Sequence, residues 1–241
     1  MKISLYTLIL PRIELPFLEE WITHNLSIGV DEIFIYNNGF ISIDKNSDSK
    51  RVVKDYIWSK KPKLDYSDDL SDEKIIAELN TIQSKYKGKV HIKSWVYKKD
   101  HEDEYPKSQI TGFKHCVENN NSDYWLFCDP DEHFVLQKHK TFQDLINDKK
   151  YKDVGAFWFG SKLYKRRKKG IATSELKFTG QIRKAVGNWK NTKCSSKSLV
   201  KMPICWAYKR DSIIHKNRSC YGKNINLSME IAYFKHYLLS G

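Results

Sequence analysis

The first 36 residues constrain the fold of this chain more than any other segment. Two short and nearly continuous apolar runs, Ile3–Leu10 and Glu32–Tyr36, flank a segment with apolar residues at helical spacing, Leu15–Ile28. Such runs are typical of strands that are buried on both faces of a sheet. Gly29 follows the helical segment, where a glycine commonly ends a helix. A strand, a helix and a second strand with short connections predict a right-handed crossover between parallel strands.

The same alternation continues through the first half of the chain. The patterns predict a helix, a strand, a second helix and another buried strand, in the order Ser71–Tyr86, Val90–Val96, Tyr105–Glu118 and Asp123–Cys128. Ser71 is the expected N-cap of the first of these helices, because its hydroxyl can accept a hydrogen bond from the first turn. The polar residues 42–71 have little periodicity and predict a long connection.

The second half of the chain changes to strands without intervening helices. A short helix at Thr141–Asn147 precedes the first of these strands, Val154–Phe159, and the basic segment Lys162–Gly170 predicts an exposed loop. We therefore expect an α/β fold with a mostly parallel, Rossmann-type central sheet flanked by helices and a mixed, basic C-terminal half. The length suits one domain, residues 1–241, with halves 1–135 and 136–241.

Charge is distributed very unevenly between the halves. Residues 1–120 hold 18 Lys and Arg against 19 Asp and Glu, whereas residues 121–241 hold 24 against 10, which accounts for the net charge of +13. A positive field raises the local concentration of anions such as phosphates, acidic glycans, nucleic acid or a lipid surface. Because 35 of the 42 basic residues are Lys, a solvated surface explains the same composition equally well.

No stretch approaches the ~20 apolar residues that a membrane helix needs. The apolar run Ile3–Leu10 is not followed by a signal-peptide cleavage pattern. The five cysteines form no Cys-x-x-Cys pair, which argues against a zinc ribbon and for reduced thiols. These features predict a soluble, cytoplasmic protein.

The residues that indicate chemistry follow the apolar strand Asp123–Cys128. Asp129, Asp131 and Glu132 are separated only by Pro130, which restricts the backbone between the two aspartates. Ligands of α/β sheets bind at the carboxyl ends of the strands, and clustered carboxylates there repel one another unless a cation compensates. Hard oxygen ligands suit Mg²⁺ or Mn²⁺, which keep positions open for phosphate oxygens. This segment therefore predicts a site for a metal and a diphosphate.

Bulky side chains divide into core and candidate binding residues. Trp21, Trp125 and Trp158 are expected in the core, whereas Trp189 and Trp206 have polar neighbours and are candidates for stacking on an acceptor sugar. His133, beside the acids, is expected to face solvent.

Several blocks carry a resemblance to a known family. They are, in chain order, Arg12-Ile13-Glu14, Leu18-Glu19-Glu20-Trp21, Gly29-Val30, Tyr36-Asn37-Asn38, Gln109, Asp129 to Phe134, Trp158 to Ser161, Lys197 to Lys201 and His236-Tyr237. In this order they resemble the GT-A-fold glycosyltransferases of the family 2-like and family 92 groups, over nearly the whole chain.

The resemblance implies a nucleotide-diphosphate sugar as donor and Mn²⁺ or Mg²⁺ as cofactor. The nucleotide-sugar-binding residues that it implies are Glu14, Asn37, Asn38, Gln109 and Asp129. The metal ligands that it implies are Asp129, Asp131 and His236. Two positions depart from the family pattern, since Ile13 replaces an Asn and Asn37 replaces an Asp. Both changes remove polar contact or charge where the nucleotide is expected, so they leave the donor base open.

An inverting transfer, the outcome we expect, needs a carboxylate that deprotonates the acceptor hydroxyl, in addition to a neutralised leaving diphosphate. From Val154 onward the acids are Glu175, Asp211 and Glu230, so the candidate base is one of these, with Glu132 as a further option. Glu175 ranks first because it follows the basic segment. A retaining reaction stays open. The acceptor is expected to be a glycan or another hydroxyl compound, with an anionic acceptor or a lipid phosphate surface as candidates for the basic segment.

Two other readings remain. A nucleic-acid-binding protein, or a metal-dependent nuclease or nucleotidyltransferase, would explain the charge. The chain carries no helix-turn-helix, RNA-binding aromatic motif or zinc finger, so no stable nucleic-acid partner is expected. The departures at Ile13 and Asn37 keep open a catalytically inactive relative that only binds.

Overall fold

The computed structural model describes residues 1–38, 71–95, 112–113, 115–152, 154–165, 184–189, 206–209 and 223–238. The described strands are β1 Ile3–Ile9, β2 Glu32–Asn37, β3 Val90–Ser94, β4 Tyr124–Phe127, β5 Glu132–Leu136, β6 Val154–Trp158, β7 Gly160–Lys165, β8 Lys184–Trp189, β9 Trp206–Lys209, β10 Lys223–Asn226 and β11 Ala232–Leu238. The described helices are α1 Pro11–Ser27, α3 Asp72–Lys85, α5 Phe142–Asn147 and the 3₁₀ turn η1 Lys149–Tyr151.

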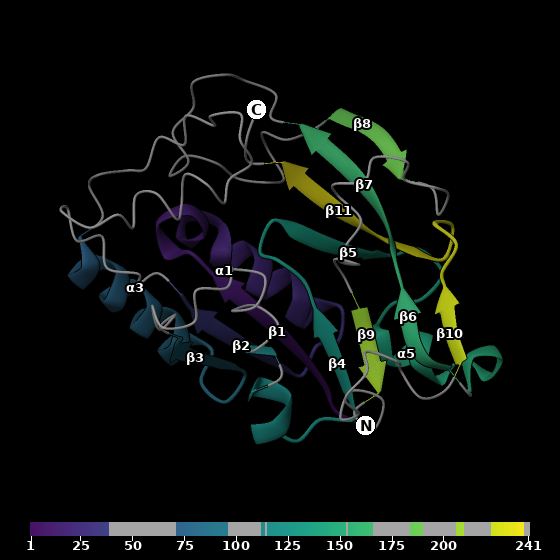
Figure 1. The fold of residues 1–241 in the computed structure, drawn as a ribbon, viewed down its shortest axis with the longest axis horizontal. Coiled ribbons are helices and arrows are strands. Elements are labelled where there is room, and N and C mark those ends of the chain that lie inside the picture. Colours follow the sequence, from purple (N-terminus) through teal and green to yellow (C-terminus); the bar gives the residue numbers. More distant parts are fainter. Residues whose placement is uncertain are drawn as a thin grey trace, which may run out of the picture.

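The strands form two sheets (Figure 1). The seven-stranded sheet has the order β10-β6-β9-β4-β1-β2-β3, and β9 alone runs against its neighbours. The four-stranded sheet has the order β5-β11-β7-β8 and mixes parallel and antiparallel pairs. The predicted α/β fold, with a mostly parallel central sheet flanked by helices, is confirmed.

The opening β1–α1–β2 unit forms as its pattern predicts, with β1 and β2 parallel. Helix α1 begins at Pro11, earlier than expected, because proline is well tolerated at the first helical position, where its missing N–H has no helical partner. The helix ends before Gly29, whose φ of +93° lies in the left-handed region that favours glycine. A Cβ at this position would also collide with Gln143 of α5, so the glycine allows α5 to pack closely.

The shorter helices are set by local hydrogen bonds. The Ser71 hydroxyl accepts from the Lys74 backbone N–H at 3.4 Å, which confirms the predicted N-cap of α3. Thr141 and Asp144 form a capping box at the start of α5, in which each side chain accepts from the backbone N–H of the other residue. These contacts begin each helix at a defined residue.

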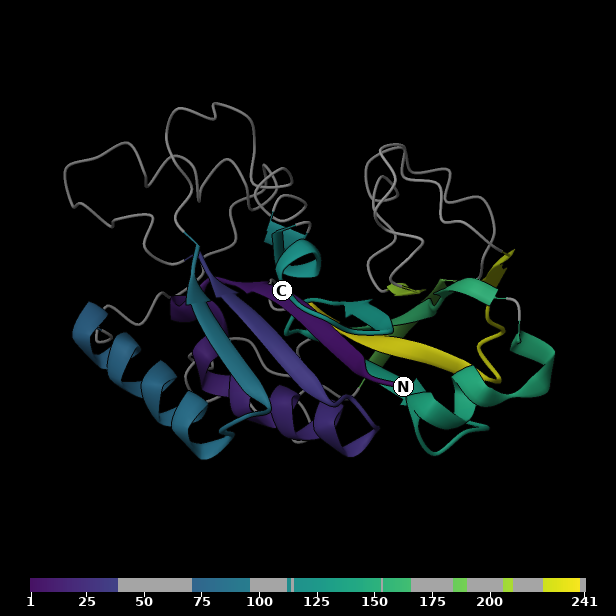
Figure 2. The same cartoon turned by 90° about the horizontal axis from the view of Figure 1, so that it is seen from below.

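Apolar side chains fill both faces of the central sheet. On one face, β1 and β2 pack against α1 and α3, which lie side by side in Figure 2. On the opposite face, Tyr6, Phe34 and Trp125 pack against Cys116 and Val117 of a helical stretch at residues 115–119. Because its strands are covered on both sides, the middle of the sheet presents mainly its strand ends to other molecules.

The structure differs from the sequence prediction in two elements. Residues 162–165 belong to strand β7, so this part of the expected basic loop is wrong, while residues 166–170 lie outside the described part. Strand β5 was not predicted, because the acidic segment reads as a turn and hides the strand that begins at its last residue. The expected connection over residues 42–70 and most of the expected helix Tyr105–Glu118 also lie outside the described residues.

None of the helices in the described part of the chain has the length and apolar character needed to span a bilayer.

Candidate functional site

The carboxyl ends of β1, β2 and β4 meet at one edge of the central sheet. Their register places Ile9 beside Asn37 and Tyr6 beside Phe127, so the segments that follow the three strands are neighbours. The Asn38 backbone N–H donates to the Ile9 carbonyl at 3.0 Å, which holds the end of β2 against the end of β1. This edge is where an α/β sheet binds its ligands.

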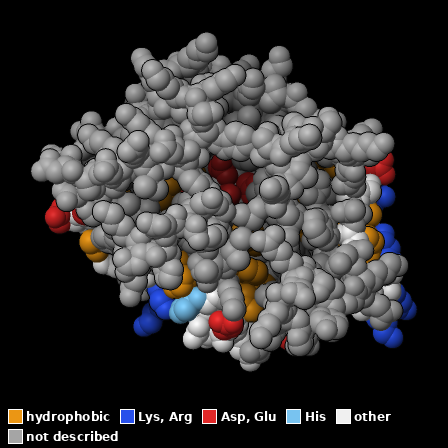
Figure 3. All heavy atoms as spheres, viewed as in Figure 1, with side chains coloured by type: hydrophobic (Ala, Val, Ile, Leu, Met, Phe, Trp, Pro, Cys, Tyr) orange, Lys and Arg blue, Asp and Glu red, His pale blue; other side chains and the backbone are white. Residues whose placement is uncertain are grey.

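Three carboxylates from two segments gather at this edge. Glu14 lies in the first turn of α1, directly after β1, and Asp129 and Asp131 follow β4. Burial raises the pKa of Glu14 well above its usual value, and the negative charges of Asp131 and Asp129 raise it further. Figure 3 shows acidic side chains near the middle of this view of the molecule. In a chain of net charge +13, this edge of the sheet is a local concentration of negative charge.

The two aspartates stand on a tight turn. The Glu132 backbone N–H donates to the Asp129 carbonyl at 3.0 Å, which closes a four-residue turn with Pro130 at its second position, where proline is favoured. The Glu132 side chain is fully buried, and its carboxylate accepts from the Asp129 backbone N–H at 3.0 Å. Glu132 therefore bonds to both backbone polar groups of Asp129.

Helix α1 holds the strand that follows this turn. The indole N–H of Trp21 donates to the Glu132 carbonyl at 2.9 Å, and the His24 Nε2–H donates to the Phe134 carbonyl at 2.8 Å. Among the described strands, β5 lies at the edge of its sheet and pairs with β11 alone, and these two carbonyls face away from β11. Side chains of α1 thus take the place of a neighbouring strand. The predicted core position of Trp21 is confirmed, as is that of Trp125.

His133 is buried, at 6% exposed, so the expectation that it faces solvent is wrong. Both faces of β5 are covered at this point, because Glu132 and Phe134 are buried as well, and the ring of His133 lies against that of His24 at 5.0 Å between ring centres. Burial, with smaller contributions from the charges of His24 and Lys235, lowers the pKa of His133 to about 3. His133 is therefore a neutral core histidine at neutral pH.

The end of β2 places two asparagines at the same edge. Asn37 and Asn38 are 3% and 1% exposed. Among the residues that the structure describes, neither the nitrogen nor the oxygen of the Asn38 side-chain amide has a hydrogen-bond partner. A buried amide without partners costs about 1–3 kcal/mol of stability, so its presence beside the acidic cluster points to a ligand that completes it.

A separate pocket of about 430 Å³ lies on the sheet face opposite α1. Phe34 and Tyr36 of β2, His91 and Lys93 of β3 and His115 are among its lining residues. Tyr36 and His115 share a hydrogen bond of 2.8 Å, and the rings of Phe34 and His91 stack. No local pattern in the sequence predicts this pocket, because its lining comes from strands and a helical stretch that are distant in the chain.

A match over most of the chain shows the family. The model of glycosyltransferase family 92 matches residues 65–239. The chain belongs to glycosyltransferase family 92. The predicted resemblance to this family is thus confirmed.

Individual relatives of this family 92 chain are distant. A glycosyltransferase family 92 protein of Ricinus communis is 28% identical over 150 residues, which are 61% of this chain and 19% of that protein. The chain therefore spans about a fifth of the length of this curated relative.

Solved structures with a similar arrangement are more distant still. The mannosyltransferase PcManGT of Pyrobaculum calidifontis, in complex with GDP-Man and Mn²⁺, has a TM-score of 0.42 at 7% identity and covers 88% of this chain and 45% of its own. TarS of S. aureus has a TM-score of 0.43 at 12% identity, and the match covers 98% of this chain and 60% of the TarS chain.

In the family 92 chain, the C-terminal part of β11 lies beside the turn Asp129–Glu132, which we call the acidic turn. The antiparallel register of β11 and β5 places His236 opposite Glu132, directly after Asp131. The backbone of Trp206 in β9 lies beside Phe127, at the end of β4. The backbone of Trp189 lies in β8, beside Ser161 of β7. Two candidates from the C-terminal half, His236 and Trp206, therefore have their backbones close to the acidic edge.

Glu230 has a different location. It is exposed in the turn before β11, and its backbone N–H donates to the Ser228 hydroxyl at 3.2 Å. This turn precedes Ala232, which pairs with Leu136 at the far end of β5. At about 3.3 Å per strand residue, the four steps from Ala232 to His236 separate Glu230 from the acidic turn by more than about 13 Å.

The remaining candidates are outside the described part of the chain. Gln109, Glu175 and Asp211 lie there entirely, and the side chains of Ile13, Trp158, Trp189, Trp206 and His236 do as well. Among the described side chains, no group of three or more His, Cys, Asp or Glu is arranged to hold a metal ion by itself. The contacts of Glu132, Trp21 and His24 were not predicted, although the Glu-Glu-Trp block of the family pattern marks that helix.

Proposed function

We propose that this family 92 chain transfers a sugar from a nucleotide-diphosphate sugar to the hydroxyl group of a glycan or another acceptor. The observation that carries the proposal is the gathering of Glu14, Asp129 and Asp131 at the carboxyl edge of the sheet, in a chain of this family. Mutual repulsion among carboxylates that raises the pKa of one of them is relieved when a cation binds.

Asp129 and Asp131 are the proposed ligands of Mn²⁺ or Mg²⁺, with His236 joining them from β11. When bound, such an ion would neutralise the leaving diphosphate. All three residues carry hard oxygen or imidazole donors, which fits these metals, and the diphosphate would supply further ligands. The two aspartates can therefore bind the ion together with its substrate, without a complete protein cage.

The nucleoside is proposed to lie over the ends of β1 and β2. There Glu14 lies beside the acidic turn, and Asn37 and Asn38 end the neighbouring strand. The Asn38 amide offers one donor group and one acceptor to a base or a ribose, which would satisfy both of its unpartnered atoms. Gln109 is kept as a proposed contact of the donor.

The acceptor is proposed to approach from the basic C-terminal half. Trp206, whose backbone lies beside the end of β4, is the better placed of the two stacking candidates, and Trp189 is the other. For an inverting reaction, Glu175 and Asp211 are the proposed bases, since Glu230 lies at the far end of β11. The positive charge of this half favours an anionic acceptor or a lipid phosphate surface.

Calorimetric titration with a panel of nucleotide-diphosphate sugars, each with Mn²⁺, Mg²⁺ or EDTA, tests the proposal. One donor should bind only with a divalent cation, and Asp131→Ala should weaken its binding by roughly 100-fold or more. Asp123→Ala, at the other end of the same strand, is the matched control and should bind normally. Transfer or hydrolysis of the bound donor then separates an enzyme from an inactive relative. Metal-independent binding, or nucleic-acid binding that Asp131→Ala leaves unchanged, would contradict the proposal.

A further inference from the structure

The acidic turn contains a carboxylate whose position differs from those of its neighbours. Asp129 and Asp131 are partly exposed, whereas Glu132 has no exposed surface. Its carboxylate accepts from the Asp129 backbone N–H at 3.0 Å, and its own backbone N–H donates to the Asp129 carbonyl at 3.0 Å. A carboxylate that is buried beneath the turn and bonded to its backbone is badly placed to take a proton from an acceptor.

The turn is fixed from a second side by α1. The Trp21 indole, also fully buried, donates to the Glu132 carbonyl at 2.9 Å. The same helix carries Glu14 seven residues earlier, about 10 Å along the helix axis. One helix therefore connects the third carboxylate of the cluster to the backbone that carries the other two.

We propose that Glu132 is a positioning residue, which, together with Trp21, fixes the backbone from which Asp129 and Asp131 reach the metal ion. This inference rests on the proposed function, because it assigns a supporting role at the same site. Carboxylate ligands need defined directions, and loss of the groups that orient metal ligands typically weakens metal binding by about 10–100-fold. The inference also removes Glu132 from the candidate bases.

Mn²⁺ binding, measured by the loss of the free-ion signal in electron paramagnetic resonance, tests the inference without a substrate. Glu132→Leu removes the acceptor for the Asp129 N–H and should weaken Mn²⁺ binding by about 10–100-fold. Glu132→Gln keeps an acceptor oxygen and should bind within about 3-fold of wild type, since its amide oxygen can still accept from the Asp129 N–H and hold the turn. If Glu132→Gln binds as weakly as Asp129→Asn, Glu132 is itself a ligand and the inference is wrong.

A tryptophan pair provides the matched control. Trp21→Phe removes the indole donor but keeps an aromatic ring, and should weaken Mn²⁺ binding by about 5-fold, the value of one ordinary hydrogen bond. Trp125 is equally buried, and its indole nitrogen has no hydrogen-bond partner among the described residues, so Trp125→Phe should bind Mn²⁺ as wild type does. Equal affinities for the two variants would overturn the inference, even where Glu132→Leu does not fold.

Asp129→Asn separates this inference from the proposed function. If Asp129→Asn binds Mn²⁺ normally, the proposed metal site itself is wrong. If Asp129→Asn loses Mn²⁺ while folded Glu132→Leu keeps wild-type affinity, the site stands and the positioning role is wrong. Thermal unfolding of each variant, followed by circular dichroism, shows that the affinities belong to folded protein.

Discussion

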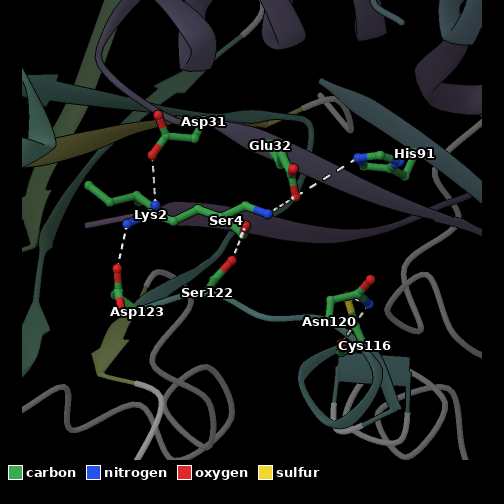
Figure 4. Close-up of polar contacts among 10 residues, drawn as sticks. Lys2, Ser4, Asp31, Glu32, His91, Cys116, Asn120, Ser122 and Asp123 are labelled. Atoms are coloured by element: carbon green, nitrogen blue, oxygen red, sulfur yellow. Dashed lines mark hydrogen bonds and ion pairs between the residues drawn. The ribbon is translucent and has the colours of Figure 1, made fainter. Parts of the chain in front are cut away.

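Carboxylates gather at both ends of the central sheet, and the two sets have different surroundings. At the amino end, Asp31 accepts from the Ile3 N–H at 2.8 Å, Asp123 accepts from the Lys2 N–H at 2.6 Å, and Glu32 pairs with the Lys2 ammonium at 2.8 Å (Figure 4). At the carboxyl end, Glu14, Asp129 and Asp131 lie close enough for the two aspartates to raise the pKa of the glutamate. One set stabilises the strand ends, and the other concentrates negative charge.

Structural and functional acids of an α/β protein differ in what surrounds them. The amino-end carboxylates accept hydrogen bonds from backbone N–H groups and pair with a lysine, as expected of groups that stabilise the fold. At the carboxyl end, Glu14 likewise accepts from a backbone N–H, that of Leu10 at 2.5 Å, but the nearby charges of Asp131 and Asp129 oppose its ionisation. Such a cost to the unliganded protein is common at sites that are completed by a ligand.

The largest expected effect is a loss of folding stability at low pH. The pKa of a buried histidine such as His133 is lower in the folded protein than in the unfolded chain, where it is near 6.5. Above about pH 6.5 both states are neutral and the protein has its full stability. As the pH falls from about 6.5 toward the folded-state pKa, only the unfolded chain takes up the proton, so the stability is lost. For His133, with a folded pKa of about 3, stability should fall by roughly 1.4 kcal/mol per pH unit below pH 6. The pKa of His24 is lowered in the same direction, mainly by burial.

Urea unfolding of the metal-free protein between pH 7 and 4.5 measures this slope. His133→Gln should reduce the slope by about 1.4 kcal/mol per pH unit, because one proton fewer is taken up on unfolding. Identical slopes for wild type and His133→Gln would show that His133 does not contribute to the pH dependence of the free energy of unfolding.

Paired substitutions at the two ends should have opposite signs. In EDTA, Asp131→Asn should raise the free energy of unfolding by up to about 1 kcal/mol, because it removes repulsion with Glu14. Asp123→Ala should lower the free energy of unfolding by about 1 kcal/mol, because the Lys2 N–H loses its acceptor. Chemical unfolding at pH 7 measures both free energies. A loss of stability in Asp131→Asn would show that the acids at the carboxyl end stabilise the fold as those at the amino end do.

The smallest expected effect on stability is at Asn38, a single buried amide at the carboxyl end of the sheet. Asn38→Leu should leave the stability of the metal-free protein unchanged or raise it by up to about 1 kcal/mol, because the amide has no partner among the described residues. The same change should weaken donor binding about 10-fold, since it removes both hydrogen-bonding groups. Titration with the donor that binds wild type measures this, and unchanged affinity would exclude Asn38 from the nucleotide site.

Much of the first half of the fold could be predicted from the sequence. The apolar runs of β1 and β2, the helical spacing of α1 and the cap at Ser71 are local patterns, and each formed as expected. The position of Asp129 after a buried strand likewise predicted that the aspartates lie at the carboxyl edge. These predictions succeeded because periodicity and capping depend on neighbours within one or two turns of the chain.

The failures have a common origin in long-range pairing. Strand β5 was missed because the acids before it indicate a turn, whereas its pairing with the distant β11 shows that the strand begins at Glu132. His133 was expected to be exposed because its neighbours in the chain are acids, whereas its neighbours in space are His24 and the core. Residues 162–165 are rich in charge, yet they form β7 between β11 and β8.

Local patterns in the sequence were enough to predict the strands and helices of the opening half, the acidic segment after β4 and the family. Only the tertiary structure decided that Trp21 and Glu132, 111 residues apart, share a hydrogen bond and that His236 lies opposite the acidic turn. Strand register and burial are set by the packing of distant segments against one another. A local pattern holds no information about which distant residue will complete a contact, so the surroundings of the acids had to come from the fold.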